Sequence, residues 1–322
     1  MALLPVYAEL ASPNRPEGME RIIAFTNHKG GVGKTTLCSN FAGQCGEAGY
    51  RVLVIDLNGQ GNVGDDLGYR DRPGVDDQGE GLYEAIRRPD RNALQAYEVR
   101  PNVWVVPGGE ELSALTTLVG QKVQNDGREA NLALAATLAP IAKDYDIVVI
   151  DSPPENPTLL DLVLAAAHWV VMPTRSDSAG LRGMKLTARR FAAAREINPS
   201  IALLGVVLFG TLSNATMLHE EVRVKVAAEF GGLSPMLSTF IRYAERTAKD
   251  ARDLGLLFHE LEVTDPEARR QLITSLRATG NKKRRALSAA TGSAARDFHD
   301  FTSEVLDIIS AAEAAQLEEP NR

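Results

Sequence analysis

The sequence predicts an α/β fold, in which helices cover both faces of a doubly wound, mostly parallel sheet. Two observations indicate this class. Short, almost continuously apolar runs rich in β-branched residues recur along the chain, and segments with helical spacing separate most of them. Strands buried on both faces have this continuous apolar character, because crossover helices cover both sides of a parallel sheet. We therefore expect about seven strands.

The elements are expected in the following order. The first strand, 21–26, leads through a glycine-rich turn into a helix over about 34–47. The next strands are expected at 50–57, 103–108, 145–153, 168–174 and 201–209. The run 237–241 is either an edge strand or an apolar loop. The polar, turn-rich segment 70–81 is expected to be a loop, and 108–127 a short helix with a polar connection.

The chain changes character after Thr264, where only helical patterns follow. A capping pattern with Pro266 in its first turn starts one helix, and a second is expected over about 284–314. We expect an N-terminal arm (1–20), a main α/β domain (21–263) and a C-terminal helical extension (264–322) packed on that domain.

Composition and charge limit the classes of function. The 322 residues are 44% apolar and 24% charged, as in ordinary globular proteins. The net charge of −7 repels nucleic acid, so DNA binding requires a local basic patch. Cys38 and Cys45, the only cysteines, are expected to be buried in a reducing compartment. Residues 1–20 do not resemble a signal peptide, and 159–172 is too short and polar to span a bilayer, so we expect a cytoplasmic protein.

The stretch NHKGGVGKTT, residues 27–36, lies between a strand and a helix, where a phosphate-binding loop belongs. Its backbone amides and the positive helix end are expected to bind phosphate. The loop residues concerned are Gly30, Gly31, Val32 and Gly33. Lys34 is expected between the terminal phosphates, Thr35 on Mg²⁺ and Thr36 on an inner phosphate oxygen.

Two carboxylates are candidates to complete the magnesium shell. Asp56 ends the strand of VLVIDLNGQGN, and Asp151 ends that of DIVVIDSPPE. A lone aspartate after a strand is more often a turn or cap residue. Two of them beside a phosphate loop favour function, because ligands bind at the carboxyl ends of strands in open α/β sheets.

Three motifs carry a family resemblance over about residues 20–260. KGGVGKTT, DLNGQGN and VVIDSPP resemble the deviant Walker A loop, switch I and Walker B motifs of the ParA/MinD ATPases. The chain is most similar to ParA-type DNA partition ATPases that lack an N-terminal helix-turn-helix domain. The resemblance implies a P-loop NTPase fold, slow hydrolysis of ATP with Mg²⁺, and a role in plasmid or chromosome segregation.

The loop departs from the usual G-x-x-x-x-G-K-[ST] pattern, with His28 at the first glycine position and an extra lysine, Lys29. The resemblance implies that Lys29 is the family's signature lysine, which reaches the partner's ATP in a sandwich homodimer. ATP would then favour the dimer, because it contacts both subunits.

Switch I departs from the family pattern D-x-D-P-Q-G-N, because Asn58 replaces the second aspartate and Gly59 the proline. An amide can orient water but cannot accept its proton. Phosphoryl transfer depends mostly on positioning and charge neutralisation, so this replacement is compatible with activity. Without a proton acceptor at position 58, we expect slow hydrolysis and a long-lived ATP state.

The resemblance also implies a nucleoid-associated protein that binds double-stranded DNA non-specifically and is released by a ParB-like centromere-binding partner. The segment 242–252 carries a net charge of +2 and offers Arg242, Arg246, Lys249 and Arg252. The spacing of the first three predicts one helix face. The second candidate is the run 269–285, which has seven cations and no acidic residue. Its cations are Arg269, Arg270, Arg277, Lys282, Lys283, Arg284 and Arg285. Such a patch would bind phosphates, although many charge runs are only solvated surface.

There are three alternatives to DNA partition. MinD-like positioning at the membrane requires a basic amphipathic C-terminal helix. Here acidic residues surround the apolar face of the tail, so we expect packing on the core or a partner and no membrane contact. Those residues are Asp297, Asp300, Glu304 and Asp307. An iron–sulfur reductase is excluded because no cysteine follows Cys45. ParA-like positioning of a non-DNA cargo stays open.

Overall fold

An eight-stranded sheet forms the centre of the protein in the computed structural model, which describes residues 9–89, 93–232, 234–263 and 291–318. The strand order is β3-β4-β2-β5-β1-β6-β7-β8. The strands are β1 (Ile22–Phe25), β2 (Val52–Asp56), β3 (Tyr97–Arg100), β4 (Val103–Val106), β5 (Ile147–Asp151), β6 (Trp169–Thr174), β7 (Ala202–Thr211) and β8 (Met236–Arg242). All neighbouring pairs are parallel except β3–β4. The predicted doubly wound, mostly parallel sheet is confirmed.

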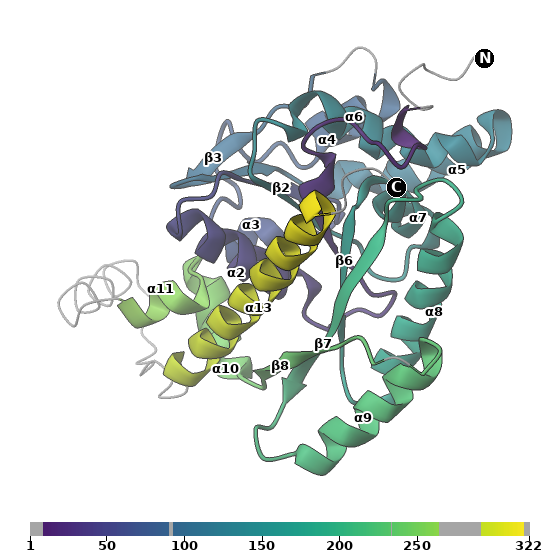
Figure 1. Cartoon of the computed structure of the whole chain (residues 1–322). Helices are drawn as coiled ribbons and strands as arrows, with labels where there is room; N and C mark the ends of the chain where they lie inside the picture. The colour runs from purple at the N-terminus through teal and green to yellow at the C-terminus, as the bar shows by residue number, and fades with distance from the viewer. Residues whose placement is uncertain (1–8, 90–92, 233, 264–290, 319–322) are drawn as a thin grey trace.

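Helices cover both faces of this sheet (Figure 1). One face packs against α2 (Lys34–Glu47), α3 (Asn62–Asp66), α10 (Glu245–Leu254), α11 (Phe258–Val263) and α13 (Thr291–Glu318). The other packs against α4 (Glu80–Arg87), α5 (Leu115–Asp126), α6 (Ala133–Ala142), α7 (Pro157–Ala166), α8 (Ser178–Ala194) and α9 (Thr216–Glu229). Three short 3₁₀ turns, η1 (Met19–Arg21), η2 (Glu110–Ala114) and η3 (Arg128–Leu132), complete the described elements.

The alternation of side chains along β1 explains the two layers of core. Ile22 and Ala24 join the α4–α9 layer, whereas Ile23 and Phe25 join the α2 layer, and all four are fully buried. Successive side chains of a strand point to opposite faces, so only a continuously apolar strand can serve two helical layers.

The C-terminal helix α13 packs on the α2 face and lies across α2 (Figure 1). Phe301 inserts between Phe25 and Phe41, with ring centroids 6.3 Å from each. Phe298 and Val305 are also fully buried. The tail therefore uses its apolar face for the core of this chain, one of the two outcomes expected from the sequence.

Three elements differ from expectation or settle an alternative. The run 237–241 lies in β8, an edge strand rather than a loop. The antiparallel strand β3 was not predicted, because its polar sequence YEVR is only partly buried. The region 108–127 contains the 12-residue helix α5 rather than a short helix with a polar connection.

Part of the N-terminal arm is anchored to the sheet domain. Leu10 and Met19 are fully buried. The half-buried guanidinium of Arg15 donates hydrogen bonds to the carbonyls of Ala165 (2.5 Å) and Ala166 (3.0 Å) at the end of α7. A cation at this position satisfies carbonyls that have no partner within the helix and interacts favourably with its negative end.

Candidate nucleotide-binding site

The ends of three central strands converge at the phosphate loop. The sheet register pairs Asp56 of β2 with Asp151 of β5, and Asp151 with Phe25 of β1. Residues 26–33 follow β1 directly and lead into α2. The fold therefore brings the predicted loop and both predicted carboxylates to the carboxyl edge of the sheet, where open α/β folds bind ligands.

The loop adopts a backbone that requires glycine at its end. Gly31 and Gly33 have φ of 73° and 90°, in the left-handed region. A β-carbon on Gly33 would also lie 2.4 Å from the ring of Phe209. Gly33 then accepts the first helical hydrogen bond, from Leu37 N (2.9 Å), so α2 points its N-terminus at the site.

Helix α8 packs against the phosphate loop and stabilises it. The amide N–H of His28 donates to Thr187 Oγ1 at 2.9 Å, and Asn27 Oδ1 accepts from Lys29 N at 2.8 Å. A β-carbon on Gly183 would approach Asn27 Oδ1 to 2.4 Å, so this glycine permits the close contact. Neither Thr187 nor Gly183 was predicted, because nothing local in the α8 sequence indicates a contact with a loop about 160 residues earlier.

Lys34 is held in place before any phosphate binds. It is 6% exposed, and its Nζ donates to Lys29 O at 3.0 Å. Burial lowers the pKa of Lys34 to about 8, while the carboxylate of Asp151 opposes that shift. A buried ammonium with a single carbonyl acceptor gains by binding a phosphate group.

Thr35, Asp56 and Asp151 form an anionic, oxygen-rich group beside the loop. Thr35 Oγ1 donates to Asp151 Oδ2 at 2.7 Å, and Asp151 Oδ1 is buried without a hydrogen-bond partner among the described residues. Burial raises the pKa of Asp151 to about 7. It also raises the pKa of Asp56, and the charge of Asp151 adds to that shift.

This group fits Mg²⁺. Two buried carboxylates with raised pKa values and an unpaired oxygen are stabilised by a divalent cation, and Mg²⁺ takes oxygen ligands. No cluster of three or more His, Cys, Asp or Glu in the described ranges is arranged to bind a metal by itself. Mg²⁺ at nucleotide sites commonly uses only one or two carboxylates and completes its shell with phosphates and water.

Asn58 closes the turn that follows β2. It is 5% exposed, its N–H donates to Asp56 Oδ1 at 3.0 Å, and its Oδ1 accepts from Gln60 N at 3.1 Å. A β-carbon on Gly108 would lie 2.5 Å from Asp56 O, so the loop after β4 presses closely on this turn. The side-chain oxygen of Asn58 therefore has a structural role in the turn.

Lys29 is the most accessible lysine of the loop. Its side chain is 43% exposed, and Nζ lies 3.0 Å from Glu155 Oε1, whose side chain is 60% exposed. Glu155 N also donates to His28 O at 2.7 Å, which ties the segment after β5 to the phosphate loop. No role was predicted for Glu155, although it directly follows the VVIDSPP motif.

The four cations expected on α10 are not equivalent, and the expected helix face is wrong. Arg242 is the last residue of β8, since α10 begins only at Glu245, and its guanidinium pairs with Asp297 of α13 at 2.5 Å. Arg252 pairs with Asp66 at 3.0 Å. Arg246 and Lys249 are exposed. The basic run 269–285 lies outside the described residues.

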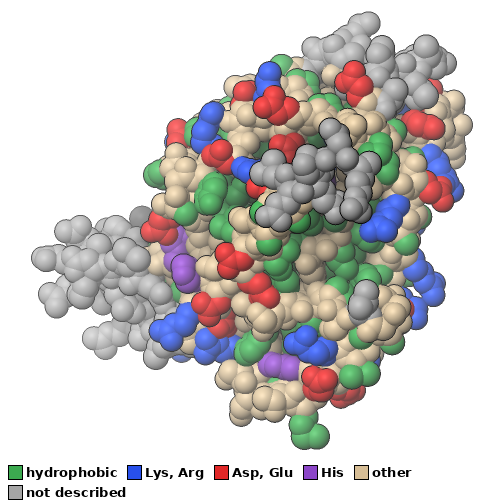
Figure 2. All heavy atoms as spheres, in the orientation of Figure 1, with side chains coloured by type: hydrophobic (Ala, Val, Ile, Leu, Met, Phe, Trp, Pro, Cys, Tyr) green, Lys and Arg blue, Asp and Glu red, His purple; other side chains and the backbone are tan. Residues whose placement is uncertain are grey.

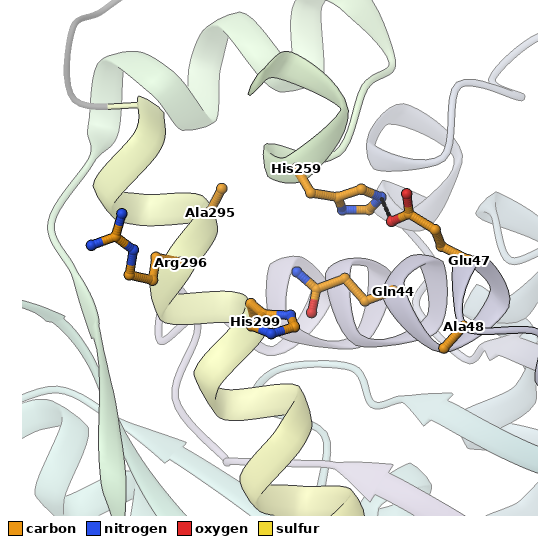
Figure 3. Close-up of a pocket in the computed structure, with 7 residues that line it drawn as sticks. All are labelled: Gln44, Glu47, Ala48, His259, Ala295, Arg296 and His299. Atoms are coloured by element: carbon orange, nitrogen blue, oxygen red, sulfur yellow. Dashed lines mark ion pairs between the residues drawn. The ribbon is translucent and has the colours of Figure 1, made fainter. Parts of the chain in front are cut away.

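Away from this site, the described residues form a surface of mixed charge and a cavity. Figure 2 shows basic and acidic side chains mixed over the described part of one face. A cavity of about 500 Å³ lies between the end of α2 and the helices α11 and α13, where His299 faces Gln44 and His259 pairs with Glu47 at 3.4 Å (Figure 3). In the part of the chain that the structure describes, no helix is both long and apolar enough to cross a bilayer.

The chain is similar to proteins of known family. A family model described as "AAA domain" matches residues 20–203. Chromosome partitioning protein ParA of Myxococcus xanthus is 35% identical over 209 residues, which cover 63% of this chain and 70% of the relative. Chromosome-partitioning ATPase Soj of Thermus thermophilus is 35% identical over 212 residues, covering 66% and 77%.

Solved structures show the same fold. The ATP complex of a Cyanothece McdA variant has a TM-score of 0.63 at 22% identity and covers 83% of this chain and 98% of that one. Cobyrinic acid a,c-diamide synthase of Mycobacterium smegmatis, with bound ADP and magnesium, has a TM-score of 0.60 at 26% identity, covering 73% and 92%.

Proposed function

Because the chain belongs to the ParA/MinD family of P-loop ATPases, we propose that it is a partitioning ATPase. In this proposal the protein hydrolyses ATP slowly and forms an ATP-sandwich homodimer. The dimer binds double-stranded DNA non-specifically on the nucleoid and is released when a ParB-like partner stimulates hydrolysis. The observation that carries the proposal is the half-exposed Lys29, which lies on a phosphate loop whose own buried lysine is Lys34.

The phosphate-binding part rests on the geometry of the loop. The loop amides and Lys34 would hold the terminal phosphates, and Thr35, Asp56 and Asp151 would hold Mg²⁺ through their oxygens. The similar cobyrinic acid a,c-diamide synthase structure contains ADP and magnesium, which supports this ligand pair. When bound, Mg²⁺ neutralises charge on the phosphates and so favours phosphoryl transfer.

In the proposed dimer, Lys34 and Lys29 would each neutralise phosphate charge on a different nucleotide. Lys34 is buried and fixed on its own loop, so it serves the nucleotide of its own subunit. Lys29 pairs at the surface with the exposed carboxylate of Glu155, so its side chain can turn toward a second subunit. A cation that reaches a second nucleotide only in the closed dimer makes ATP a ligand of the dimer rather than the monomer.

Slow hydrolysis follows from switch I. Asn58 would orient a water molecule near the terminal phosphate but cannot accept its proton, and its Oδ1 is already engaged by Gln60 N. The protein supplies positioning and charge neutralisation without a carboxylate base at this position. The ATP-bound dimer would therefore be long-lived until a partner acts.

For DNA, the proposal rests on Arg246 and Lys249 of α10 and on the run 282–285. Arg242 and Arg252 are already neutralised by Asp297 and Asp66, so they offer less charge to phosphate groups. Contacts of this kind bind any sequence and weaken steeply with salt.

The test is binding of a random-sequence DNA duplex at fixed, near-physiological salt with Mg-ATP, Mg-ADP or no nucleotide. We expect binding only with Mg-ATP, and loss of both binding and dimerisation in Lys29→Ala. The matched control is Lys143→Ala, which removes an exposed lysine near the start of β5. Absence of DNA binding in every state, with dimerisation intact, would remove DNA from the proposal and favour a protein cargo.

A further inference from the structure

Helix α3 is tied directly to a carboxylate of the nucleotide site. It starts at the end of the switch I turn, and Val63 N, in its first turn, donates to Asp56 Oδ2 at 3.3 Å. Gly61 N donates to Asn58 O at 2.9 Å, so the turn and the helix form one short, hydrogen-bonded segment. A ligand that engages Asp56 therefore acts on the start of α3.

The other end of α3 is tied to α10. Asp66, its last residue, is 6% exposed and pairs with Arg252 Nε at 3.0 Å. Asp66 Oδ2 has no hydrogen-bond partner in the described part of the chain. A buried carboxylate with so few hydrogen-bond partners depends strongly on the cation that pairs with it, so the Asp66–Arg252 pair ties α10 to α3.

Backbone contacts make this junction close. A β-carbon on Gly68 would lie 2.8 Å from Gly255 O, and one on Gly255 would lie 2.7 Å from Gly68 Cα. Arg100 spans the junction, because its guanidinium donates to the carbonyls of both Leu67 and Gly255 and pairs with Glu260. The chain just after α3 and the chain just after α10 are therefore in direct contact.

The segment after α10 is also fixed to the phosphate-loop helix. Phe258 N donates to Asn40 Oδ1 on α2 at 2.9 Å, and a β-carbon on Gly43 would lie 2.1 Å from Leu257 Cδ1. Helix α10 is therefore connected to both elements that leave the nucleotide site, α2 and α3. Its exposed cations, Arg246 and Lys249, lie on the same short helix.

We propose that Asp66 and Arg252 are positioning residues that couple the nucleotide state at Asp56 to the placement of α10, and that Arg252 is not a DNA contact. The inference rests on the proposed function, because it names how the nucleotide regulates the surface that would carry DNA. Physically, a ligand shifts a remote element only if the intervening contacts differ between two states. The short helix α3, held at both ends, is the element that transmits the difference.

The test is amide hydrogen exchange of the full chain with Mg²⁺ and a non-hydrolysable ATP analogue, compared with the nucleotide-free protein. In the wild type we expect the analogue to change exchange in both α3 and α10. In Asp66→Asn and in Arg252→Gln, the α3 response should persist and the α10 response should fall at least threefold. Arg246→Gln, a charge-matched change on the same helix, should keep both responses.

Arg252→Lys, which keeps the charge, should restore part of the α10 response, a result that a merely structural role for Arg252 would not produce. Thermal unfolding confirms that each variant is folded, and Arg252→Lys or Arg252→Gln decides the matter if Asp66→Asn does not fold. An α10 response that is absent in the wild type, or unchanged in both Asp66→Asn and Arg252→Gln, overturns the inference.

A DNA measurement separates this inference from the proposed function. Arg246→Gln should weaken DNA binding in Mg-ATP while α10 keeps its exchange response to the nucleotide, whereas Arg252→Gln should weaken DNA binding together with that response. If the wild type binds no DNA, the proposed function fails, but hydrogen exchange still decides whether Asp66 and Arg252 couple the two sites.

Discussion

Lys29 Nζ lies 3.0 Å from Glu155 Oε1, so the lysine proposed to serve the partner's nucleotide is bound within its own subunit. Both side chains are well exposed, and this pair is weak enough to break when a stronger anion approaches. In the proposed dimer, Glu155 would therefore compete with the phosphates of the second subunit's nucleotide for Lys29.

The first prediction concerns this competition. Glu155→Gln removes the carboxylate charge but keeps the size of the side chain, so Lys29 is free to leave. We expect the dissociation constant of the dimer in Mg-ATP to fall a few-fold, measured by sedimentation. Glu196→Gln serves as the control, because it makes the same change in an exposed ion pair that does not involve Lys29, the pair with Arg128. An unchanged dimer affinity in Glu155→Gln would show that the pair does not restrain Lys29.

The second prediction concerns the rate of hydrolysis. In Asn58→Asp the side chain can keep its turn, since a carboxylate oxygen also accepts the hydrogen bond from Gln60 N. The new carboxylate supplies the base that is missing, so we expect single-turnover phosphate release to rise about tenfold or more. Asn125→Asp, which adds the same charge at an exposed position near the end of α5, should leave the rate near that of the wild type. Equal rates in Asn58→Asp and the wild type contradict the proposed cause of slow turnover.

The sequence predicted the site where its information is local. KGGVGKTT dictates a loop between a strand and a helix, and aspartates at the ends of apolar runs meet because parallel strands end at one edge of the sheet. The support of the loop by Thr187, and the pairing of Arg252 with Asp66, depend on which helices face each other. No periodicity within α8 or α10 specifies that arrangement.

The misplacement of Arg242 has the same origin. Its spacing from Arg246 and Lys249 matches a helix. In the structure, however, Arg242 is the seventh and last residue of β8, where it pairs with Thr211 of β7. Asp297 of α13 then accepts hydrogen bonds from both the backbone N–H and the guanidinium of Arg242. These contacts with β7 and α13 determine the position of Arg242, and the helical spacing of only three cations was too weak a signal to predict it.

The third prediction assigns a role to the N-terminal arm. Arg15→Ala removes the donors to the carbonyls of Ala165 and Ala166, which would be left without their cation at the end of α7. We expect the free energy of unfolding to fall by about 1–3 kcal/mol, measured in urea. Arg21→Ala breaks the more exposed pair with Glu313 and should cost less than about 1 kcal/mol. Equal losses in the two variants would refute a specific role for Arg15.

The last prediction is a dependence of stability on pH that arises at His168. Burial lowers the pKa of this half-buried imidazole to about 4, and the positive charge of Arg15 adds to the effect. In the unfolded chain its pKa returns to about 6.5, so between these values the unfolded state binds the proton and the folded state does not. Stability from this group is thus fully present above about pH 6.5 and is lost as the pH falls toward 4.

The pKa difference corresponds to at most about 3 kcal/mol, and the partial exposure of the ring lowers the expected loss of stability to about 2 kcal/mol. Urea unfolding at pH 7.0 and pH 4.5 gives the loss of unfolding free energy for the wild type. This loss also contains the contribution of carboxylates that titrate over the same range. In His168→Gln the same carboxylates titrate but the imidazole does not, so the loss should be smaller by about 2 kcal/mol. An NMR titration of the imidazole locates the pKa directly. A loss in His168→Gln as large as that in the wild type would assign the acid sensitivity to carboxylates alone.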